Sequence, residues 1–380
     1  MTDIRTDRYL RHEQIDWFSQ DAVRSARIVV VGAGAIGNEV VKNLALLGAG
    51  AVDIYDFDKV EEHNLTRSVF LRESDIGEGK ATAVVRRASE VDPGVRLRAI
   101  EGDFWEHLSV WRLGEYDCAI AAVDNFEARV RLNQMCMLAG TNFVSAAIDS
   151  RHAAIESYAH GDAWGGACYE CHLPESAYGR MAERYSCGGL RRRARASRQV
   201  PTTAVTASIA GALAASTALR LGAAGDEGSA SRRVLIDTIA GGSTVTVLER
   251  NADCAACQGM LEQPVVVRTR NRWSLAPEMN EAGHALGQVL RLSDPLVTGY
   301  ECAQCGALPE AARYLDRRAA DFDDSIATCP RCAEPAVRIE IRQRFELGEL
   351  VERFGTRPVP AKFALAHIGG RMVCFDFEEG

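Results

Sequence analysis

The chain has 380 residues, 47% of them hydrophobic and 25% charged, which is the composition of an ordinary water-soluble globular protein. This length predicts two or three domains. A formal net charge of −8 argues against nucleic acid as the main partner, because a polyanionic backbone would be repelled. The first residues, Met1–Leu10, are polar and charged and show no signal peptide, so we expect a cytoplasmic protein.

The following part of the chain alternates short strands with helices. Arg27–Val31 is a β-branched run before a glycine, Asn38–Leu47 has helical spacing of apolar residues, and Ala51–Tyr55 reads as a second strand. The alternation continues with a helix, two strands, a helix and a strand at Lys80–Val91, Val95–Ile100, Cys118–Val123, Glu127–Leu138 and Asn142–Ile148. This order predicts an α/β fold with a Rossmann-like, doubly wound parallel sheet.

The pattern changes after Ile148. The runs Ala153–Ala159, Val234–Ile239 and Thr244–Leu248 look like strands, and we expect them to extend the sheet in antiparallel fashion.

An uncharged run, Thr202–Leu219, is long enough to span a membrane. Its Ala, Ser, Thr and Gly residues instead predict a helix packed closely inside a soluble core, and no membrane association is expected. Either Thr202 or Thr203 is expected to cap this helix.

We expect a domain boundary near residue 262, which separates a main domain, residues 1–261, from a smaller accessory module, residues 262–380. The elements expected in the module are a helix around Ala282–Leu292 and short strands at Arg338–Arg342 and Met372–Phe377.

A glycine-rich loop joins the first predicted strand to the first helix. Its pattern, Gly32-x-Gly34-x-x-Gly37, permits a tight turn and close approach of the backbone to a phosphate at the helix N-terminus. Asp56 follows the second strand, nineteen residues after Gly37, where a carboxylate accepts hydrogen bonds from ribose hydroxyls. The loop alone predicts nucleotide binding but does not separate NAD, FAD and ATP.

Charged and amide side chains follow the later strands. Asn64, Arg67 and Lys80 come after the second strand, and Asp124 after the strand that begins at Cys118. Each has an ordinary alternative role as a solvated or helix-capping residue. Their recurrence favours a catalytic role, because strand ends converge on one crevice. An enzyme that transfers hydride does not need this set of residues. An enzyme that stabilises charge at an α-phosphate and releases pyrophosphate does need it.

A set of short motifs runs through about residues 5–260. They are Arg8-Tyr9-Leu10-Arg11, the glycine loop, Asp56-Phe57-Asp58, Asn64-Leu65-Thr66-Arg67, Gly77-Glu78-Gly79-Lys80, Asp124-Asn125-Phe126-Glu127-Ala128-Arg129 and two cysteine pairs, Cys168/Cys171 and Cys254/Cys257. With these motifs the chain resembles the ThiF/MoeB/HesA family, the bacterial relatives of ubiquitin-activating enzymes. The resemblance implies ATP-dependent adenylation of the C-terminal carboxylate of a small β-grasp protein.

The resemblance also implies roles for single residues. Arg11 is similar to the arginine that the family's homodimer inserts into the neighbouring subunit's site, so a homodimer is expected. The implied ligands are ribose for Asp56, the triphosphate for Asn64, Arg67 and Lys80, and Mg²⁺ for Asp124. Two positions depart from the family, Ser68 and His12, where Gln is usual; both leave the charged set intact.

Eight of the twelve cysteines form Cys-x-x-Cys pairs, which is a metal-ligand spacing. Because the sequence shows no export signal, we expect these cysteines to bind metal and not to form disulfides. Four thiolates make a closed tetrahedral zinc site, which is structural rather than hydrolytic. We expect two such Zn²⁺ sites: Cys168, Cys171, Cys254 and Cys257, with 82 residues between the pairs, and a zinc ribbon of Cys302, Cys305, Cys329 and Cys332, with 23 between.

One further thiol, Cys187, lies in a glycine-containing loop ahead of an arginine-rich run, Arg191–Arg198. Neighbouring arginines favour the reactive thiolate. In relatives, the cysteine of this loop attacks the acyl-adenylate to form a thioester, or carries sulfur. The alternative is an incidental surface cysteine. The basic run is either a clamp for an acidic partner surface or a solvated face.

The sequence therefore predicts an activating enzyme that adenylates a ubiquitin-like protein ending in Gly and then forms a thioester on Cys187. The mobile cysteine loop and the added zinc module favour a bacterial ubiquitin-like conjugation system with a conjugating enzyme. The absence of a recognisable rhodanese domain disfavours a fused sulfurtransferase. The alternatives are sulfur-carrier activation of the thiamin or molybdopterin type, peptide or small-molecule adenylation, and a non-catalytic nucleotide-binding scaffold.

Overall fold

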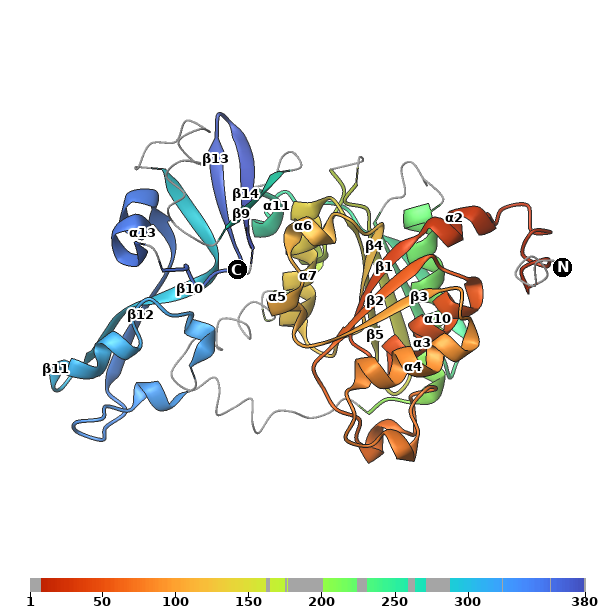
Figure 1. Cartoon of the computed structure of the whole chain (residues 1–380), viewed down its shortest axis with the longest axis horizontal. Helices are drawn as coiled ribbons and strands as arrows, with labels where there is room; N and C mark the ends of the chain where they lie inside the picture. The colour runs from red at the N-terminus through yellow and green to blue at the C-terminus, as the bar shows by residue number, and fades with distance from the viewer. Residues whose placement is uncertain are drawn as a thin grey trace. The chain divides into compact units, whose positions relative to one another are not determined.

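The computed structural model describes residues 8–161, 165–174, 176, 201–223, 231–258, 264–270, 288–322, 324–355 and 357–378 (Figure 1). Cys187 and the run Arg191–Arg198 lie outside the described residues. The described chain divides into two compact units. The first takes its residues from Met1–Leu108, Arg112–His172 and Val200–Gln263, and the second from Ser109–Trp111, Leu173–Gln199 and Pro264–Gly380.

The first unit is built on an eight-stranded sheet with the order β3-β2-β1-β4-β5-β6-β7-β8. Its first five strands pair in parallel and its last three in antiparallel fashion, which confirms both the Rossmann-like sheet and its extension. The strands are β1 (Arg27–Val31), β2 (Ala51–Asp56), β3 (Arg96–Glu101), β4 (Cys118–Ala121), β5 (Asn142–Ile148), β6 (His152–Tyr158), β7 (Arg232–Asp237) and β8 (Gly242–Val247).

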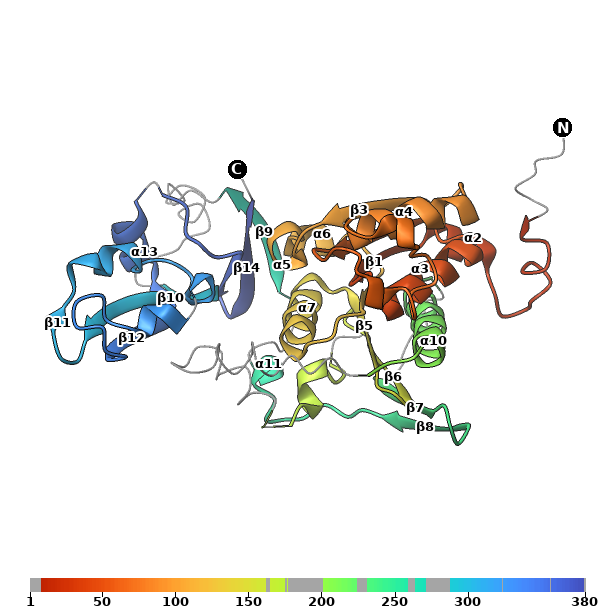
Figure 2. The ribbon, with the colours of Figure 1, turned by 90° about the horizontal axis from the view of Figure 1, so that it is seen from below.

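Helices cover both faces of this sheet (Figure 2). The main core joins one face to three helices, α3 (Ala35–Leu47), α4 (Lys80–Val91) and α10 (Ala204–Ala223), through buried aliphatic side chains. The opposite face carries α7 (Phe126–Ala139), which packs on β4 and β5. Shorter elements are α2 (Gln20–Ser25), α5 (Phe104–His107), α6 (Val110–Leu113), α11 (Ala255–Gln258), η1 (Glu62–Asn64), η2 (Glu73–Asp75) and η3 (Tyr169–His172).

The predicted alanine-rich core helix is α10. Thr203 caps it, because its Oγ1 accepts a hydrogen bond of 3.2 Å from the backbone N–H of Thr206. Gly211 brings the helix close to α3, since a Cβ at this position would lie 2.3 Å from the Cβ of Glu39. Within the described residues, Ala204–Gly222 has the length and hydropathy to cross a membrane, yet more than half of it is buried in the first unit. This burial is the packing of a core helix.

The second unit is a six-stranded sheet with the order β11-β10-β13-β14-β9, in which β12 also pairs with β10. Its core gathers buried side chains such as Leu290, Leu292 and Phe345 around α13 (Leu347–Phe354). The strands are β9 (Val265–Arg270), β10 (Val289–Cys302), β11 (Gly306–Ala307), β12 (Val337–Glu346), β13 (Phe363–Ile368) and β14 (Arg371–Glu378), and the short helices are η5 (Pro309–Arg313), η6 (Ala319–Asp321) and η7 (Asp324–Ala327).

The prediction of a helix around Ala282–Leu292 is wrong for the part of this range that the structure describes. Val289–Leu292 begins β10, with exposed and buried side chains in alternation. Leu290 and Leu292 therefore point to one face, which is the period of a strand and not of a helix. Pairing with β12 and β13 supplies the backbone hydrogen bonds of this segment. The strands predicted at Arg338–Arg342 and Met372–Phe377 are confirmed as parts of β12 and β14.

Candidate functional site

The glycine loop after β1 has the backbone of a phosphate-binding turn. Gly32 has φ = +100°, and a Cβ there would lie 2.5 Å from the carbonyl oxygen of Ala122. A Cβ at Gly37 would lie 1.9 Å from the carbonyl oxygen of Gly32, so neither position tolerates a side chain. A Cβ at Gly34 would have no neighbour within 4 Å. The loop thus closes tightly on one side and stays open at the N-terminus of α3, where a phosphate would sit.

Asn38, in the first turn of α3, holds the loop to a second segment. Its fully buried amide donates to the carbonyl oxygens of Ala33 (2.7 Å) and Gly34 (3.0 Å). Its Oδ1 accepts a 3.0 Å hydrogen bond from the backbone N–H of Phe70. Asn38 therefore fixes the glycine loop against the segment that follows Arg67. Sequence reasoning assigned it no role; the available signal was an amide residue in the first turn of the helix, directly after the glycine loop.

Asp56 ends β2 beside the glycine loop. Its carboxylate accepts hydrogen bonds from the backbone N–H groups of Ala33 (2.6 Å) and Asp58 (2.7 Å). Burial raises the pKa of Asp56, and these two hydrogen bonds partly offset that rise. Because a carboxylate has about four acceptor positions, Asp56 keeps capacity for ribose hydroxyls while it orders the loop.

The segment between β2 and α4 carries the predicted triphosphate residues. Lys80 opens α4, is largely buried, and places its Nζ 2.8 Å from Oδ2 of Asp58. Arg67 donates a 2.7 Å hydrogen bond to the carbonyl oxygen of His63. Asn64 is buried, and its Oδ1 accepts from the N–H of Glu61 at 3.0 Å, so it caps η1. Asn64 in this structure thus orders the segment that bears Arg67.

Asp124 follows β4 and is exposed, in front of α7. Its neighbour Asn125 caps α7 by accepting a 2.8 Å hydrogen bond from the N–H of Ala128. Behind them, the buried guanidinium of Arg129 donates to Oγ of Ser145 (2.7 Å) and to the carbonyl oxygen of Val123. Burial lowers the pKa of Arg129. The exposed oxygens of Asp124 are hard ligands of the kind that Mg²⁺ binds.

The sheet order brings most of these residues to one edge. Asp56 ends β2, and Gly32 and Asp124 follow β1 and β4. These three strands are adjacent and parallel, so their carboxyl ends share an edge. In doubly wound sheets, ligands bind in the crevice at this edge. Lys80 also starts its helix there, because α4 runs back along the sheet from this end.

Arg11 does not join this group within the chain. It is exposed, in a turn next to Tyr9, whose hydroxyl donates to Asp92 just after the C-terminus of α4. A Cβ at Gly48, just after the C-terminus of α3, would collide with the Tyr9 ring, so the ring packs there as well. Arg11 therefore lies at the end of the sheet opposite to the glycine loop.

The first cysteine cluster brings together thiols from segments far apart in the sequence. The four Sγ atoms lie within 4.8 Å of one another, and all four residues are buried. The separations between pairs include 3.8 Å for Cys168–Cys254 and 3.6 Å for Cys171–Cys257. A tetrahedral zinc with Zn–S bonds of about 2.3 Å requires S–S separations of about 3.8 Å. The cluster therefore fits Zn²⁺.

The second cluster, in the other unit, has the same composition. Its four Sγ atoms also lie within 4.8 Å of one another, and Cys302 and Cys332 are 3.8 Å apart. Cys302 and Cys329 are buried, whereas Cys305 and Cys332 are half-buried. This cluster fits Zn²⁺ as well.

Helix α7 links the candidate nucleotide site to the first cysteine cluster. Asn133 is fully buried, and its Oδ1 accepts a 3.1 Å hydrogen bond from the N–H of Tyr169, the residue after Cys168. One residue further along α7, Gln134 donates a 2.9 Å hydrogen bond to Glu170. The helix that begins behind Asp124 therefore also holds the first cysteine knuckle.

Comparison with known proteins identifies a family and several relatives of this chain. A model of the ThiF family matches residues 6–256. The chain is 33% identical over 174 residues to the sulfur carrier protein adenylyltransferase of Thermus thermophilus, covering 44% of this chain and 64% of that protein. It is 32% identical over 173 residues to the SAMP-activating enzyme E1 of Haloferax volcanii, covering 45% of this chain and 63% of that protein. The chain thus spans less than two thirds of either relative.

Solved structures show a similar fold. The structure of E. coli MccB with ATP has a TM-score of 0.53 and 22% identity, covering 68% of this chain and 74% of that chain. The structure of PaaA has a TM-score of 0.51 and 16% identity, covering 65% of this chain and 84% of that chain. Because the family model spans most of the chain, and the predicted fold is present, this protein is a member of the ThiF family.

Proposed function

We propose that this protein is an adenylyltransferase that uses Mg·ATP to activate the C-terminal carboxylate of a small β-grasp protein ending in glycine. The observation that supports this most directly is the edge shared by the glycine loop, Asp56 and Lys80 in a ThiF-family chain. A phosphate-binding turn, a carboxylate for the ribose and a largely buried lysine form a site for a nucleoside triphosphate.

The chemical step follows from that arrangement. An oxygen of the partner's C-terminal carboxylate attacks the α-phosphorus of ATP, a new P–O bond forms, the α–β bridging P–O bond breaks, and pyrophosphate leaves. Arg67 and Lys80 neutralise the negative charge that collects on the leaving phosphates. Asp124 would hold Mg²⁺, which supplies further charge neutralisation on the phosphate oxygens.

Sulfur-carrier activation is the better supported fate of the adenylate. One relative is named a sulfur carrier protein adenylyltransferase. Another, from Mycobacterium tuberculosis, is named a probable adenylyltransferase/sulfurtransferase MoeZ and is 33% identical over 144 residues, covering 37% of this chain and 37% of that protein. Ubiquitin-like conjugation, which the sequence analysis favoured, has less support among the relatives. In the conjugation route the thiolate of Cys187 would attack the acyl-adenylate, form a thioester and release AMP; in the sulfur-carrier route the alternative is that Cys187 carries sulfur. Both roles stay predictions, because Cys187 lies outside the described residues.

The homodimer is part of this proposal. Arg11 lies at the far end of its own sheet, so it reaches a nucleotide only in a second copy of the chain. Both cysteine clusters, with Zn²⁺ bound, would act as structural ligand sets without an open coordination position.

Nucleotide preference tests the proposal. Calorimetry should detect binding of Mg·ATP and no comparable binding of NAD. Lys80→Ala should weaken ATP binding about 10- to 100-fold, because it removes a charge-assisted hydrogen bond worth about 1.5–3 kcal/mol. Lys59→Ala, an exposed lysine on the same segment, is the matched control and should leave the affinity unchanged. Binding of NAD without binding of ATP would contradict the adenylation function.

A further inference from the structure

The segment between β2 and α4, residues 57–79, has little regular structure of its own. It carries Asn64 and Arg67 and leads into Lys80, and its only helices are η1 and η2, of three residues each. A segment of this kind holds two phosphate-binding cations in place only if side chains elsewhere restrain it.

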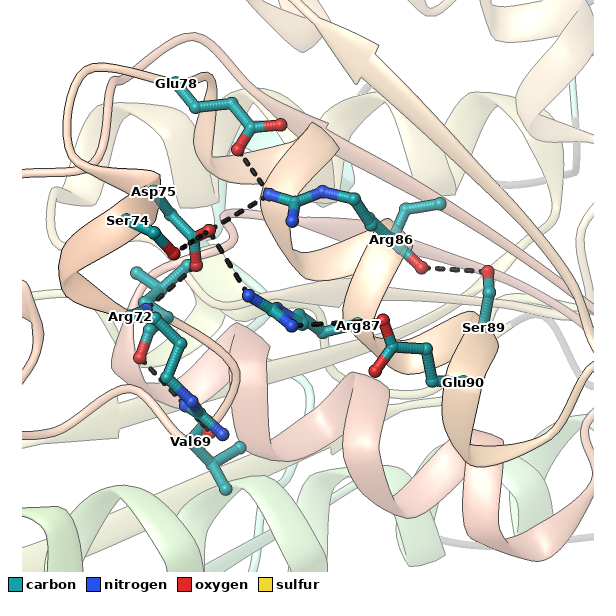
Figure 3. Close-up of polar contacts among 11 residues, drawn as sticks. Val69, Arg72, Ser74, Asp75, Glu78, Arg86, Arg87, Ser89 and Glu90 are labelled. Atoms are coloured by element: carbon teal, nitrogen blue, oxygen red, sulfur yellow. Dashed lines mark hydrogen bonds and ion pairs between the residues drawn. The ribbon is translucent and has the colours of Figure 1, made fainter.

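A buried carboxylate provides one restraint (Figure 3). The side chain of Asp75, at the end of η2, is only 1% exposed. Its oxygens accept a 2.9 Å hydrogen bond from the backbone N–H of Arg72 and a 3.1 Å hydrogen bond from the guanidinium of Arg86. A second guanidinium, that of Arg87, lies 3.6 Å away. A buried carboxylate needs such partners, because its isolated charge would be costly.

The partners of Asp75 belong to two different elements. Arg72 is on the connecting segment itself, and its guanidinium donates to the carbonyl oxygens of Val69 and Leu71, both at 2.9 Å. Arg86 and Arg87 are on α4, the helix that Lys80 opens. Asp75 therefore fastens the segment that follows Arg67 to the helix that bears Lys80.

The backbone of the same residue reaches toward Lys80. The carbonyl oxygen of Asp75 accepts a 3.0 Å hydrogen bond from the N–H of Glu78, and the carboxylate of Glu78 pairs with Arg86. On the other side, Phe70 is held by Asn38 at the glycine loop. The stretch after Arg67 is thus attached at two points, one on α3 and one on α4.

We propose that Asp75 is a positioning residue of the nucleotide site: with Arg86 and Arg87 it fixes the β2–α4 segment on α4, and so places Arg67 and Lys80 against the β- and γ-phosphates of ATP. This inference rests on the proposed function. Asp75 touches no phosphate in this role and acts through the two cations.

The test compares ATP with AMP, which lacks the phosphates in question. A shift of about 1 Å in a positioned group costs up to about 10²-fold. We expect Asp75→Asn to lower the affinity for Mg·ATP about tenfold by calorimetry, while the affinity for AMP changes less than about twofold. A general loss of structure would weaken both nucleotides alike. In an Arg67→Ala background, Asp75→Asn should have a smaller effect, because Lys80 is then the one cation of the pair that Asp75 still positions.

Two further variants keep the test decisive. Arg86→Gln removes one ion-pair partner of Asp75, at a half-exposed position, and should cause a smaller loss of Mg·ATP affinity that again spares AMP. This variant provides the test if Asp75→Asn does not fold. Glu90→Gln is the control, since Glu90 is exposed and its ion pair with Arg87 is long, at 3.9 Å. Equal loss for ATP and AMP, or unchanged ATP affinity in both test variants, would overturn this proposal alone. A wild-type protein that does not bind Mg·ATP would overturn the proposed function as well.

Discussion

The two cysteine clusters have the same four ligands and differ in what they hold together. The first closes a connection of 82 residues, has four buried thiols, and is tied by Asn133 to the helix behind Asp124. The second closes a connection of 23 residues, has two half-buried thiols, and lies among the aromatic and aliphatic side chains of its own ribbon. Closing a longer connection removes more conformational entropy from the unfolded chain. The first cluster should therefore contribute more to the stability of the fold than the second.

The same set of four cysteines therefore has a different structural role in each unit. In the first unit, the cluster is part of the scaffold that supports the candidate nucleotide site. In the second unit, the cluster organises a local ribbon between β10 and β12. Three predictions test this distinction, and a fourth concerns an ion pair of the second unit; they follow in order of decreasing effect.

Loss of the first cluster should have the largest effect. Cys168→Ser should lower the free energy of unfolding of the first unit by at least about 4 kcal/mol, because loss of a bound metal is among the most destabilising changes. The corresponding fall in Tm is about 8–16 °C, measurable by calorimetry. Mg·ATP binding should be lost with it. Cys302→Ser is the matched control and should leave Mg·ATP binding intact; equal loss of binding in both variants would remove the distinction.

Cutting the link between α7 and the first cluster should have an intermediate effect. Asn133→Ala leaves the buried N–H of Tyr169 without its acceptor, which costs about 1–3 kcal/mol in the free energy of unfolding. Chemical denaturation gives the value. Gln134→Ala, which removes a half-buried hydrogen bond to Glu170, should cost less. The link would be irrelevant if Asn133→Ala were no more destabilising than Gln134→Ala.

The two clusters should also differ in the rate at which they release metal. With zinc bound, the second cluster should lose it to a chelator about tenfold faster, because Cys305 and Cys332 are accessible whereas the first four thiols are buried. A metal-binding dye would show two kinetic phases of equal amplitude. Cys302→Ser should abolish the fast phase and Cys168→Ser the slow one; the reverse assignment would show that burial does not govern release.

The smallest effect should come from an ion pair in the second unit. A hydrogen bond from Arg342 lowers the pKa of Glu349, and burial opposes this only in part. The pair therefore adds stability above the unfolded pKa of about 4.3, and this stability disappears as the pH falls through the lower folded value. Because Glu349 and Arg342 are partly exposed, Glu349→Gln should cost less than about 1 kcal/mol at pH 7. A cost that survives high salt or low pH would contradict this account.

Much of the first unit could be predicted because its signals are local. The β-branched run Arg27–Val31 and the glycines after it define a strand, a turn and a helix, and the structure shows all three. Helix α4 begins and ends where expected, at Lys80 and Val91, because its amphipathic pattern is stopped by Pro93. The cysteine spacing also indicated the two clusters.

The residues that were missed act through contacts distant in sequence. Asn38 is an ordinary helix residue until its Oδ1 meets Phe70, 32 positions away. Asp75 looks like a surface carboxylate until α4 brings Arg86 and Arg87 to it. The start of β10 was predicted as a helix because a short apolar run has no clear period until a partner strand pairs with it.

The most direct test of the central claim is ATP–pyrophosphate exchange by the purified protein with Mg²⁺ and a set of small β-grasp proteins that end in Gly-Gly. The account predicts exchange that depends on one of the added proteins and falls about 10²-fold in Lys80→Ala. It would be contradicted by the absence of exchange with every such protein, or by exchange that Lys80→Ala leaves unchanged.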